Sequence, residues 1–438
     1  MTTAGTTAAK HHLGIRKLLA AADFRGLLAS RLAAQWGDGL FQAGLAGAVL
    51  FNPERHADPL AVAAGFAVLL LPYSVVGPFA GALLDRWDRR RVLVVANLTR
   101  GLFVVLTAAA VALGLDGVPL YASALLVTGV SRFVGSGLSA SLPHVVHEDH
   151  LVEANAFAAT LGALSAVVGA GCAVALRGLF GAGDGGSAST TAFALVGSLL
   201  AAWLASRFRP AALGPDEVVE PSRTATAVAR GLLDGARAVW RTPTVAAALL
   251  ALLAHRAAFG ASLLLTLLLM RHTFTDFGPF KAGLAGLGEV AVAGGAGILL
   301  AGLVTDRAVD LLGRRGAVCA ALLLAAVTQL GLGLPMLLPT TLAASFLLTF
   351  AGQVVKLCVD AAVQGDIGDE VRGRVFALYD TLFNVMQVAA VTAAATVVPL
   401  DGRSAGLVVA ATVAYLLGLV GYLLLVKRIP SAEQETRS

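Results

Sequence analysis

The chain has 438 residues, of which 57% are hydrophobic and only 13% are charged, and its mean hydropathy is +0.81. This composition excludes a water-soluble domain of this length and indicates a protein of the lipid bilayer. The net charge of +5 does not indicate a nucleic-acid partner, because the Lys and Arg residues lie in short loops between apolar segments.

Motifs for enzymatic chemistry and for metal binding are absent from the sequence. It contains no phosphate-binding loop, no HExxH pair and no GxSxG turn, and its three cysteines lie in apolar runs without metal-ligand spacing. We therefore expect a protein that is not an enzyme and that needs no cofactor or metal. The first 17 residues are small, polar and basic, so we expect no removable signal peptide.

Twelve apolar runs are long enough to cross about 30 Å of hydrocarbon as helices. The first six lie near residues 24–50, 60–84, 92–113, 119–142, 151–177 and 188–206. The second six lie near residues 244–270, 281–304, 316–334, 339–362, 374–398 and 404–426. The sequence thus predicts an all-α membrane protein with two pseudo-symmetric six-helix bundles, 1–206 and 244–438, joined by a linker, 207–243.

The basic residues lie mostly on the side of the predicted membrane that carries both termini. By the positive-inside rule, both termini are expected in the cytoplasm and the protein in the plasma (inner) membrane. In the linker, residues 222–241 are expected to form an amphipathic helix, since four arginines fall on one stripe at intervals of 7, 7 and 4 residues. Such a helix suits the lipid headgroup layer, and a solvated helix without contact to lipid is the alternative.

One short motif occurs twice. The pattern Gly-x-x-x-Asp-Arg closes an apolar run at residues 81–86 and does so again at residues 302–307, 221 residues later. A repeat near half the chain length indicates two related halves, which is how many secondary transporters are built. The basic cluster after the first copy partly sets the topology, but that role leaves the fixed distance between glycine and acid unexplained.

Residues 81–91 resemble the loop 2–3 signature of the major facilitator superfamily, Gly-x-x-x-Asp-Arg-x-Gly-Arg-Arg. The match departs at Asp88, where that family usually has glycine, and the second copy is looser. In the family these residues are thought to lock the cytoplasmic side by contacting a neighbouring helix end, where a carboxylate is favoured at an N-terminus. The resemblance therefore implies a gating role for Gly81, Asp85, Arg86, Arg89, Arg90, Asp306 and Arg307.

Segments along nearly the whole chain are similar to the drug:proton antiporter branch of this superfamily, which includes macrolide-efflux and enterobactin-exporter-like proteins. These segments are residues 24–28, 35–39, 72–78, 85–90 and 374–380. One feature of such antiporters is missing, because Ala170 stands where their fifth span carries a kinking proline. The resemblance implies a proton-coupled exporter and does not identify its cargo.

Four polar residues of the first span project from one helical face. They are Arg31, Gln35, Asp38 and Gln42, spaced by 4, 3 and 4 residues. A charge in hydrocarbon persists only with a partner or a wet cavity, so we expect this face to line a central cavity and to contact substrate. Asp38 is the expected proton-coupling carboxylate, with Arg132 and Arg31 as its partners, and a fixed structural Asp38–Arg132 ion pair is the alternative.

The second half repeats this pattern. Arg256 lies 225 residues after Arg31, and Glu289 in the eighth span is the second candidate for proton binding unless it pairs with Arg256. Lys356 and Asp360 are expected to neutralise each other as an i, i+4 pair. The eleventh span offers a polar stripe that is expected to face the substrate, or else to bond between helices, and that consists of Asp380, Phe383, Asn384 and Gln387. Arg100 in the third span is expected to snorkel or to pair, and no role is assigned to it.

Together these features predict a proton-coupled exporter of amphipathic small molecules, such as drugs, antibiotics or siderophore-like compounds, that works as a monomer by alternating access. The expected partners are the substrate, protons and membrane lipids. An uptake permease or uniporter of the same fold is the first alternative, and a non-transporting membrane sensor or scaffold is the second.

Overall fold

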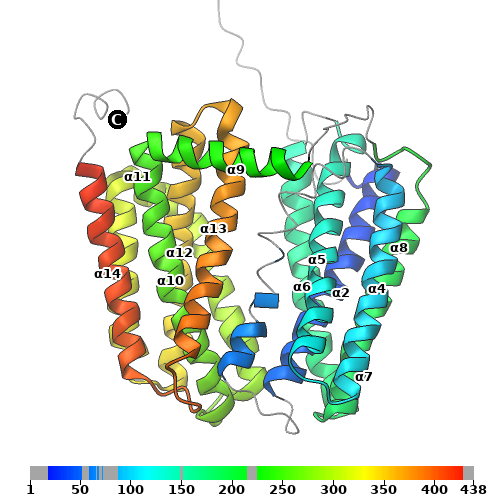
Figure 1. Cartoon of the computed structure of the whole chain (residues 1–438), viewed down its shortest axis with the longest axis horizontal. Helices are drawn as coiled ribbons and strands as arrows, with labels where there is room; N and C mark the ends of the chain where they lie inside the picture. Colours follow the sequence, from blue (N-terminus) through cyan, green and yellow to red (C-terminus); the bar gives the residue numbers. More distant parts are fainter. Residues whose placement is uncertain are drawn as a thin grey trace, which may run out of the picture.

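The computed structural model describes residues 18–51, 59–65, 67–68, 72, 87–147, 151–214 and 224–427. This part of the chain is almost entirely helical, and its long helices stand in two groups that lie side by side (Figure 1). One group precedes the linker helix α9 in the sequence and the other follows it, so each half of the chain forms one bundle.

The first bundle is built from long apolar helices with one interruption. Its helices are α2 (Ala22–Leu50), α4 (Arg89–Ala112), α5 (Val118–Ser141) with the 3-10 turn η1 (Leu142–His144), α6 (Leu151–Phe180), α7 (Asp184–Ala192) and α8 (Ala194–Ser206). α7 and α8 follow each other directly and together make the sixth predicted span. Most of the predicted span 60–84 lies outside the described residues.

The second bundle contains α10 (Pro243–His272), α11 (Gly283–Gly333), α12 (Leu338–Asp366), α13 (Asp369–Ala395) and α14 (Ala405–Lys427). α11 covers two predicted spans, 281–304 and 316–334, which are joined without an intervening loop at Gly313. The φ of 70° at this residue lies in the left-handed region, which glycine adopts without a steric cost. The chain therefore turns at Gly313 from one limb of α11 into the other.

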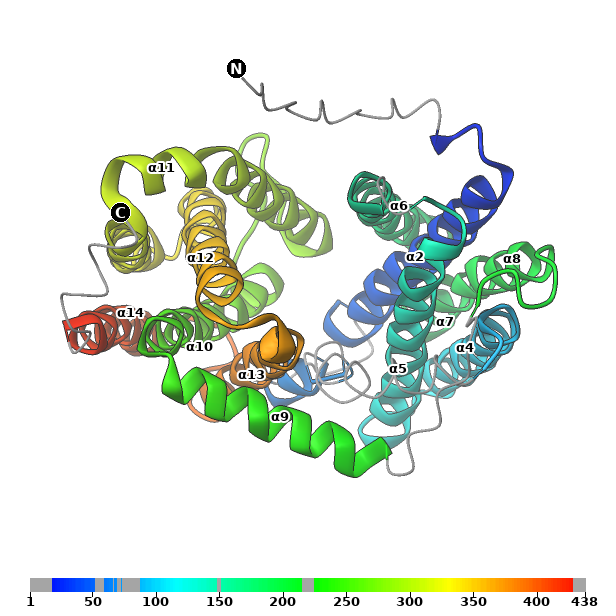
Figure 2. The ribbon, with the colours of Figure 1, turned by 90° about the horizontal axis from the view of Figure 1, so that it is seen from above.

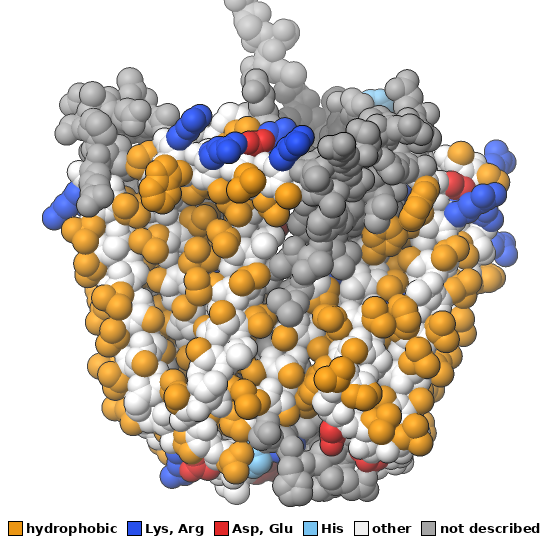
Figure 3. Space-filling model, in the orientation of Figure 1, with side chains coloured by type: hydrophobic (Ala, Val, Ile, Leu, Met, Phe, Trp, Pro, Cys, Tyr) orange, Lys and Arg blue, Asp and Glu red, His pale blue; other side chains and the backbone are white. Residues whose placement is uncertain are grey.

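The helices have the length and the surface of a membrane protein. Nine helices in the described ranges are long and apolar enough to cross a bilayer, with the two limbs of α11 counted as one. α2 has 29 residues and is long enough as well. Apolar side chains cover the side of the molecule seen in Figure 3, and charged side chains gather near its two ends.

The first residues of α2 and the last residues of α14 lie on the side of the molecule where α9 runs (Figures 1 and 2). We call this side the terminal face and the opposite side the distal face. α9 (Thr224–Arg241) packs on the second bundle, where Asp234 accepts from Arg374 Nη1 of α13 at 3.1 Å. Leu233 and Trp240 are exposed on this helix beside its arginines. The helix expected for residues 222–241 is thus present, and its contact with lipid stays a prediction.

The buried apolar side chains show where the two bundles touch. Two large clusters stay within one bundle: one lies between residues 18 and 213, and the other lies between residues 239 and 426. A third cluster takes residues from both bundles, among them Phe41 of α2, Leu264 of α10 and Val391 of α13, all in the distal part of their helices. Within the described residues, the bundles therefore share a large apolar core only toward the distal face.

α2 packs against its neighbours through glycines. Gly39 faces the backbone of Ala166, and Gly169 faces a backbone carbonyl of α2, so α2 and α6 touch where a methyl group on either glycine would collide. On another side of α2, Gly37 lies against Gly197 of α8 in the same way. Small residues let helices in a membrane approach this closely, and the fifth span keeps them although it lacks the proline.

Candidate functional site

An acid, an arginine and a serine meet between three helices of the first bundle. Asp38 Oδ1 on α2 accepts from Arg100 Nη1 on α4 at 3.0 Å and from Ser131 Oγ on α5 at 2.6 Å. The Arg100 side chain is 1% exposed, whereas the Asp38 side chain is 19% exposed. The carboxylate thus keeps access to its surroundings while its counter-ion is enclosed.

Arg100 holds more than this ion pair. Its Nε donates to Ser198 Oγ on α8 at 3.0 Å, and its Nη1 also donates to the Ala34 carbonyl of α2 at 3.3 Å. Its Nη2 is buried and has no hydrogen-bond partner among the described residues. One guanidinium therefore connects α2, α4 and α8, and α5 joins them through the serine on Asp38.

The partner of Asp38 differs from the one that the sequence predicted. We expected Arg132 or Arg31, but the ion pair is made by Arg100, to which no role was assigned. Arg132 follows Ser131 directly on α5, and successive side chains of a helix point about 100° apart, so the serine takes the position facing the acid. The sequence signal for Arg100 was a charge in the middle of an apolar run, which does not reveal the helix it faces.

The other members of the predicted α2 face lie in different surroundings. Gln35 packs against Gly162 of α6, and its Oε1 is buried without a partner in the described chain. Arg31 lines a small apolar recess near the terminal face, and Gln42 is half-buried toward the distal face. Arg31 and Gln42 are about 16 Å apart along the helix axis at ~1.5 Å per residue, so they do not converge on one small group.

Two arginines of the predicted gate bond within the first bundle. Arg89 Nη1 donates to the Ala140 carbonyl at the end of α5 at 2.9 Å, and Arg90 Nη2 donates to the Ser206 carbonyl at the end of α8 at 2.9 Å. Both cations thereby satisfy carbonyls at helix C-termini, where positive charge is favoured. Three further members of the predicted gate, Gly81, Asp85 and Arg86, lie outside the described residues.

The residue that departs from the family signature has a structural use. Asp88 is the N-cap of α4, and its Oδ1 accepts from the backbone N–H of Arg90 at 3.0 Å. Aspartate is among the preferred residues at this position, and glycine could not supply the side-chain acceptor. The substitution thus fixes the start of the helix that carries Arg100.

The second copy of the motif is exposed. The side chains of Asp306 and Arg307 lie on the surface of α11. The buried charge contact near this end of the second bundle involves Asp366 at the end of α12, whose side chain is 5% exposed. Asp366 Oδ2 accepts from Thr244 Oγ1 at 2.6 Å and lies 3.5 Å from Arg314 Nη2.

In the second bundle, Arg256 of α10 lies on the aromatic ring of Phe383 of α13. Its guanidinium carbon is 3.8 Å from the centroid of that ring and 5.7 Å from the centroid of Phe259. Its Nη1 reaches Gln387 Oε1 at 3.4 Å, and its Nε is buried without a partner in the described chain. No carboxylate among the described residues forms an ion pair with it. Three of the predicted substrate-binding residues thus come together.

Asn384 and Asp380, the other two residues of the α13 stripe, take no part in this contact. Asn384 is buried and its Nδ2 donates to the Asp380 carbonyl at 2.8 Å, while the Asp380 side chain is exposed. On α12, Lys356 Nζ and Asp360 Oδ2 are 2.7 Å apart, which confirms the expected i, i+4 pair. The cation of that pair is therefore neutralised, in contrast to Arg256.

Glu289 lies near the distal end of the first limb of α11 and does not pair with Arg256. Its Oε1 accepts from the backbone N–H of Lys281 at 3.0 Å, and its Oε2 is buried without a partner in the described chain. In the adjacent distal loop, Asp276 accepts from the Ala282 N–H at 2.9 Å and from Lys281 Nζ at 2.9 Å. These contacts lower the pKa of Asp276, with the Ala282 N–H as the largest cause, and raise the pKa of Lys281.

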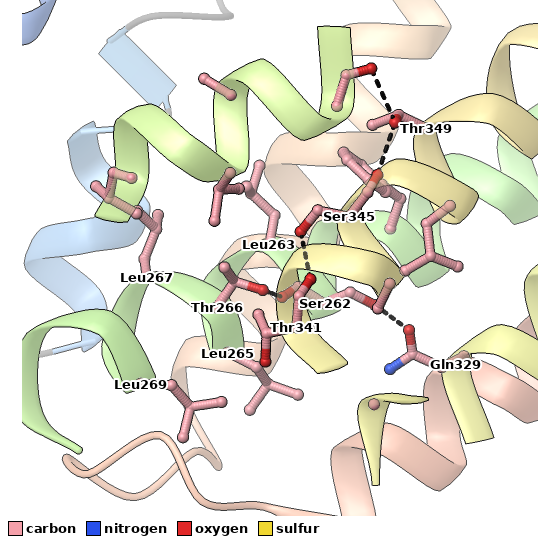
Figure 4. A pocket seen from close by; sticks show the side chains of 18 of the residues that line it. Ser262, Leu263, Leu265, Thr266, Leu267, Leu269, Gln329, Thr341, Ser345 and Thr349 are labelled. Carbon is pink, nitrogen blue, oxygen red and sulfur yellow. Dashed lines mark hydrogen bonds between the residues drawn. The ribbon is translucent and has the colours of Figure 1, made fainter. Parts of the chain in front are cut away.

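A cavity of about 430 Å³ lies inside the second bundle, between α10, both limbs of α11 and α12 (Figure 4). Its wall is mostly apolar, and none of the described residues that line it is ionisable. Six polar side chains interrupt the wall, namely Ser262, Thr266, Gln329, Thr341, Ser345 and Thr349. No pattern in the sequence indicates this cavity, because hydroxyls in an apolar helix show the same spacing whether they bond their own helix or line a space.

Comparisons with known proteins agree with this architecture. Residues 27–391 match the model of the Major Facilitator Superfamily. Uncharacterised MFS-type transporters of Mycobacterium tuberculosis and Mycobacterium bovis are each 44% identical to this chain over 411 residues, which cover 93% of this chain and 92% of theirs. Neither name states a cargo.

Solved transporter structures share the fold at low sequence identity. The nucleoside transporter NupG aligns with a TM-score of 0.65 and 12% identity over 91% of this chain and 98% of that one. A peptide transporter POT in complex with sulfate aligns with a TM-score of 0.67 and 14% identity over 97% of this chain and 99% of that one. The predicted all-α, twelve-helix membrane fold is thereby confirmed. The chain is a multi-pass membrane transporter rather than an enzyme, and it belongs to the major facilitator superfamily.

Proposed function

We propose that this protein exports amphipathic small molecules from the cytoplasm in exchange for protons, and that Asp38 binds the proton. The observation that carries the proposal is the contact of Asp38 with Arg100 and Ser131 in the middle of the first bundle. Ionisable residues inside a membrane bundle are costly and mark ion pathways. An acid that stays 19% exposed can exchange protons while its enclosed partners respond to its charge.

Protonation of Asp38 would remove the charge that Arg100 compensates. Arg100 would then keep only its hydrogen bonds to Ser198 and to the Ala34 carbonyl. Because these contacts join helices across the bundle, the protonation state of one acid biases how the bundle packs. A proton that favours one of two packings is what coupled alternating access requires.

The distribution of the apolar cores supports a conformer that is open toward the terminal face. The described parts of the bundles share their large core toward the distal face, and each has its own core elsewhere. The positive-inside rule makes the terminal face cytoplasmic. Such a conformer is the one that an exporter loads.

The gate is proposed at the terminal face. Arg89 and Arg90 already hold the ends of α5 and α8, so they make the first bundle move as one body. Asp306 and Arg307 have exposed side chains that can contact a helix end of the other bundle when the terminal face closes. Glu289 is kept as the second candidate for proton binding.

The test is transport in proteoliposomes with an imposed pH gradient. Purified protein would be reconstituted, and a panel of anionic, neutral and cationic amphipathic dyes would be followed together with internal pH. Wild type is expected to move at least one dye against its gradient while protons flow the other way. Uphill movement along the proton flux would indicate an uptake permease, and movement without pH coupling would indicate a uniporter.

The decisive variant is Asp38→Asn, with Asp360→Asn as the matched control from the second bundle. Each variant removes one membrane carboxylate that pairs with a cation. Asp38 lies 3.0 Å from Arg100, and Asp360 lies 2.7 Å from Lys356. Asp38→Asn is expected to lose pH-driven movement and to keep dye exchange without a gradient, whereas Asp360→Asn is expected to keep both. Full pH-driven export by Asp38→Asn would refute the assignment, and Glu289→Gln would be tested next.

A further inference from the structure

We propose that Arg256, the two phenylalanines beside it and the cavity of the second bundle form one binding site for an amphipathic anion. The anionic group binds at Arg256, and the apolar body lies in the cavity. It rests on the proposed function in one respect, namely that the molecule bound here is the molecule that the protein transports.

The first observation is that the charge of Arg256 has no counter-ion among the described residues. Within the described chain, the guanidinium makes one long hydrogen bond, to the amide oxygen of Gln387. Its Nε is buried and has no partner there. An arginine inside a membrane bundle normally pairs with an acid, as Arg100 does with Asp38. A carboxylate or phosphate from a ligand would supply the missing charge, and charge-assisted bonds to a guanidinium are strong.

The second observation is the orientation of the guanidinium. The ring of Phe383 lies 3.8 Å from the guanidinium carbon, so one face of the group is covered by an aromatic surface. Hydrogen bonds to a guanidinium lie in its plane and leave the face to stacking. The aromatic contact therefore holds the cation without using its donors.

The third observation is that one residue, Phe259, lies both beside this cation and in the wall of the cavity. Phe259 lies three residues, or about one helical turn, after Arg256 and lines the cavity. Its ring centroid is 5.7 Å from the guanidinium carbon. A molecule that binds at Arg256 can thus extend past Phe259 into about 430 Å³ of mostly apolar space, which lies within the size range of small-molecule sites.

The polar groups of the cavity restrict what can enter it. Ser262 Oγ donates to Gln329 Oε1 at 2.8 Å, and Ser345 and Thr349 donate to carbonyls of their own helix at 2.8 and 2.6 Å. Hydroxyls whose protons are used in this way offer only lone pairs to a ligand. The lone pairs of these three hydroxyls, together with the mostly apolar wall, suit the apolar body of a ligand better than a second anionic group.

The experiment measures binding to the full-length protein in phosphatidylcholine nanodiscs, with radiolabelled dodecanoate as the probe. Dodecyl phosphate, dodecanol and dodecyltrimethylammonium serve as competitors with the same chain. Both anions are expected to compete at least tenfold better than the alcohol and the cation, and their ratio tells whether a carboxylate or a phosphate is preferred. Equal competition by the cation would overturn the proposal.

Two variants locate the anionic end. Arg256→Gln is expected to weaken dodecanoate binding at least tenfold, and Arg256→Lys is expected to retain part of it. Arg230→Gln on the exposed side of α9 removes the same charge elsewhere and should leave the affinity unchanged. Unchanged dodecanoate affinity in a folded Arg256→Gln protein, checked by gel filtration and thermal unfolding, would overturn the proposal.

A second pair of variants locates the apolar end. Gly295 lines the cavity and a Cβ atom added there meets no atom within 4 Å, so Gly295→Leu should direct its side chain into the space without a collision at Cβ. Gly331→Leu is the control, because Gly331 has the same open surroundings, lies on the same helix and is exposed. Gly295→Leu should weaken dodecanoate binding at least tenfold and Gly331→Leu should not; equal affinity in both would overturn the cavity assignment.

These measurements need no proton gradient. Anion-selective binding that depends on Arg256 and the cavity supports the inference even where Asp38→Asn keeps full pH-driven export, and that export result refutes only the proposed coupling. Conversely, pH-driven export with no anion-selective binding refutes only the inference.

Discussion

The two bundles treat their buried charges in opposite ways. In the first bundle Asp38 and Arg100 neutralise each other, with a serine on the acid. In the second bundle Arg256 lies on Phe383 without an acid among the described residues. A paired charge is stable and can be altered by a proton, whereas an unpaired charge gains stability only when something binds. In the two proposals made above, the first half binds the proton and the second half binds the cargo.

The comparison of the two bundles predicts the largest loss of stability for a change at Arg100, the counter-ion of Asp38. Arg100→Gln leaves Asp38 without its cation and should destabilise the protein by about 3–5 kcal/mol, measured as a lower thermal midpoint in detergent. The double variant Asp38→Asn with Arg100→Gln should recover much of the loss, because no charge is left unpaired. A double variant as unstable as Arg100→Gln alone would show that the ion pair is not the cause.

A smaller effect is expected where α2, the helix of Asp38, touches α6. Gly169→Ala places a methyl group against a carbonyl of α2 and should cost about 1–3 kcal/mol of stability. Gly171→Ala is the control, since an added methyl group there meets open space and the change should be neutral or stabilising by up to about 1 kcal/mol. Equal unfolding midpoints for the two variants would mean that the glycine contact does not constrain α2.

The unpaired cation should respond in the opposite direction. Arg256→Gln removes a charge that has no counter-ion in the described chain. Its free energy of unfolding should therefore stay within about 1 kcal/mol of wild type or rise, which is measured from the thermal midpoint in detergent. Sites kept for function often carry such a stability cost. A loss as large as that of Arg100→Gln would break the comparison, because it would reveal a structural partner for Arg256.

The smallest effect concerns a charge pair outside the membrane. The pKa of Asp276 is lowered, so its stabilising contribution is present above the ordinary value of 3.8 and is lost as the pH falls through the lowered pKa. The pKa of Lys281 is raised, so its contribution is lost only as the pH rises above the ordinary value of 10.5. Thermal midpoints measured from pH 7 down to acid should fall slightly less in Asp276→Asn than in wild type, because exposed pairs contribute little.

The sequence predicted the fold far better than it predicted the contacts. Span length and hydropathy depend only on the local run of apolar residues, and they were sufficient for most of the helices in the described ranges. The partner of Asp38 depends on how α2, α4 and α5 rotate against each other, and a rotation of one residue exchanges Ser131 for Arg132. No periodicity within one helix contains that information.

The second bundle shows the same limit from the other side. Arg256, Phe383 and Gln387 were singled out because each is polar or aromatic in an apolar run, and the structure brings them together. The cavity lined by Phe259 was not predicted, since it arises from small residues on several helices whose side chains leave space. The exposed Asp380 shows that a helical stripe predicted as a unit can divide between a buried contact and the surface.

The apolar core near the distal face carries a consequence for the temperature dependence of transport. Opening the distal end would separate side chains such as Phe41, Leu264 and Val391, and would let water reach surfaces that are dry in this conformer. Hydrating apolar surface raises the heat capacity, so the activation enthalpy of this step should change with temperature. If distal opening limits the rate, an Arrhenius plot of turnover should be curved rather than straight.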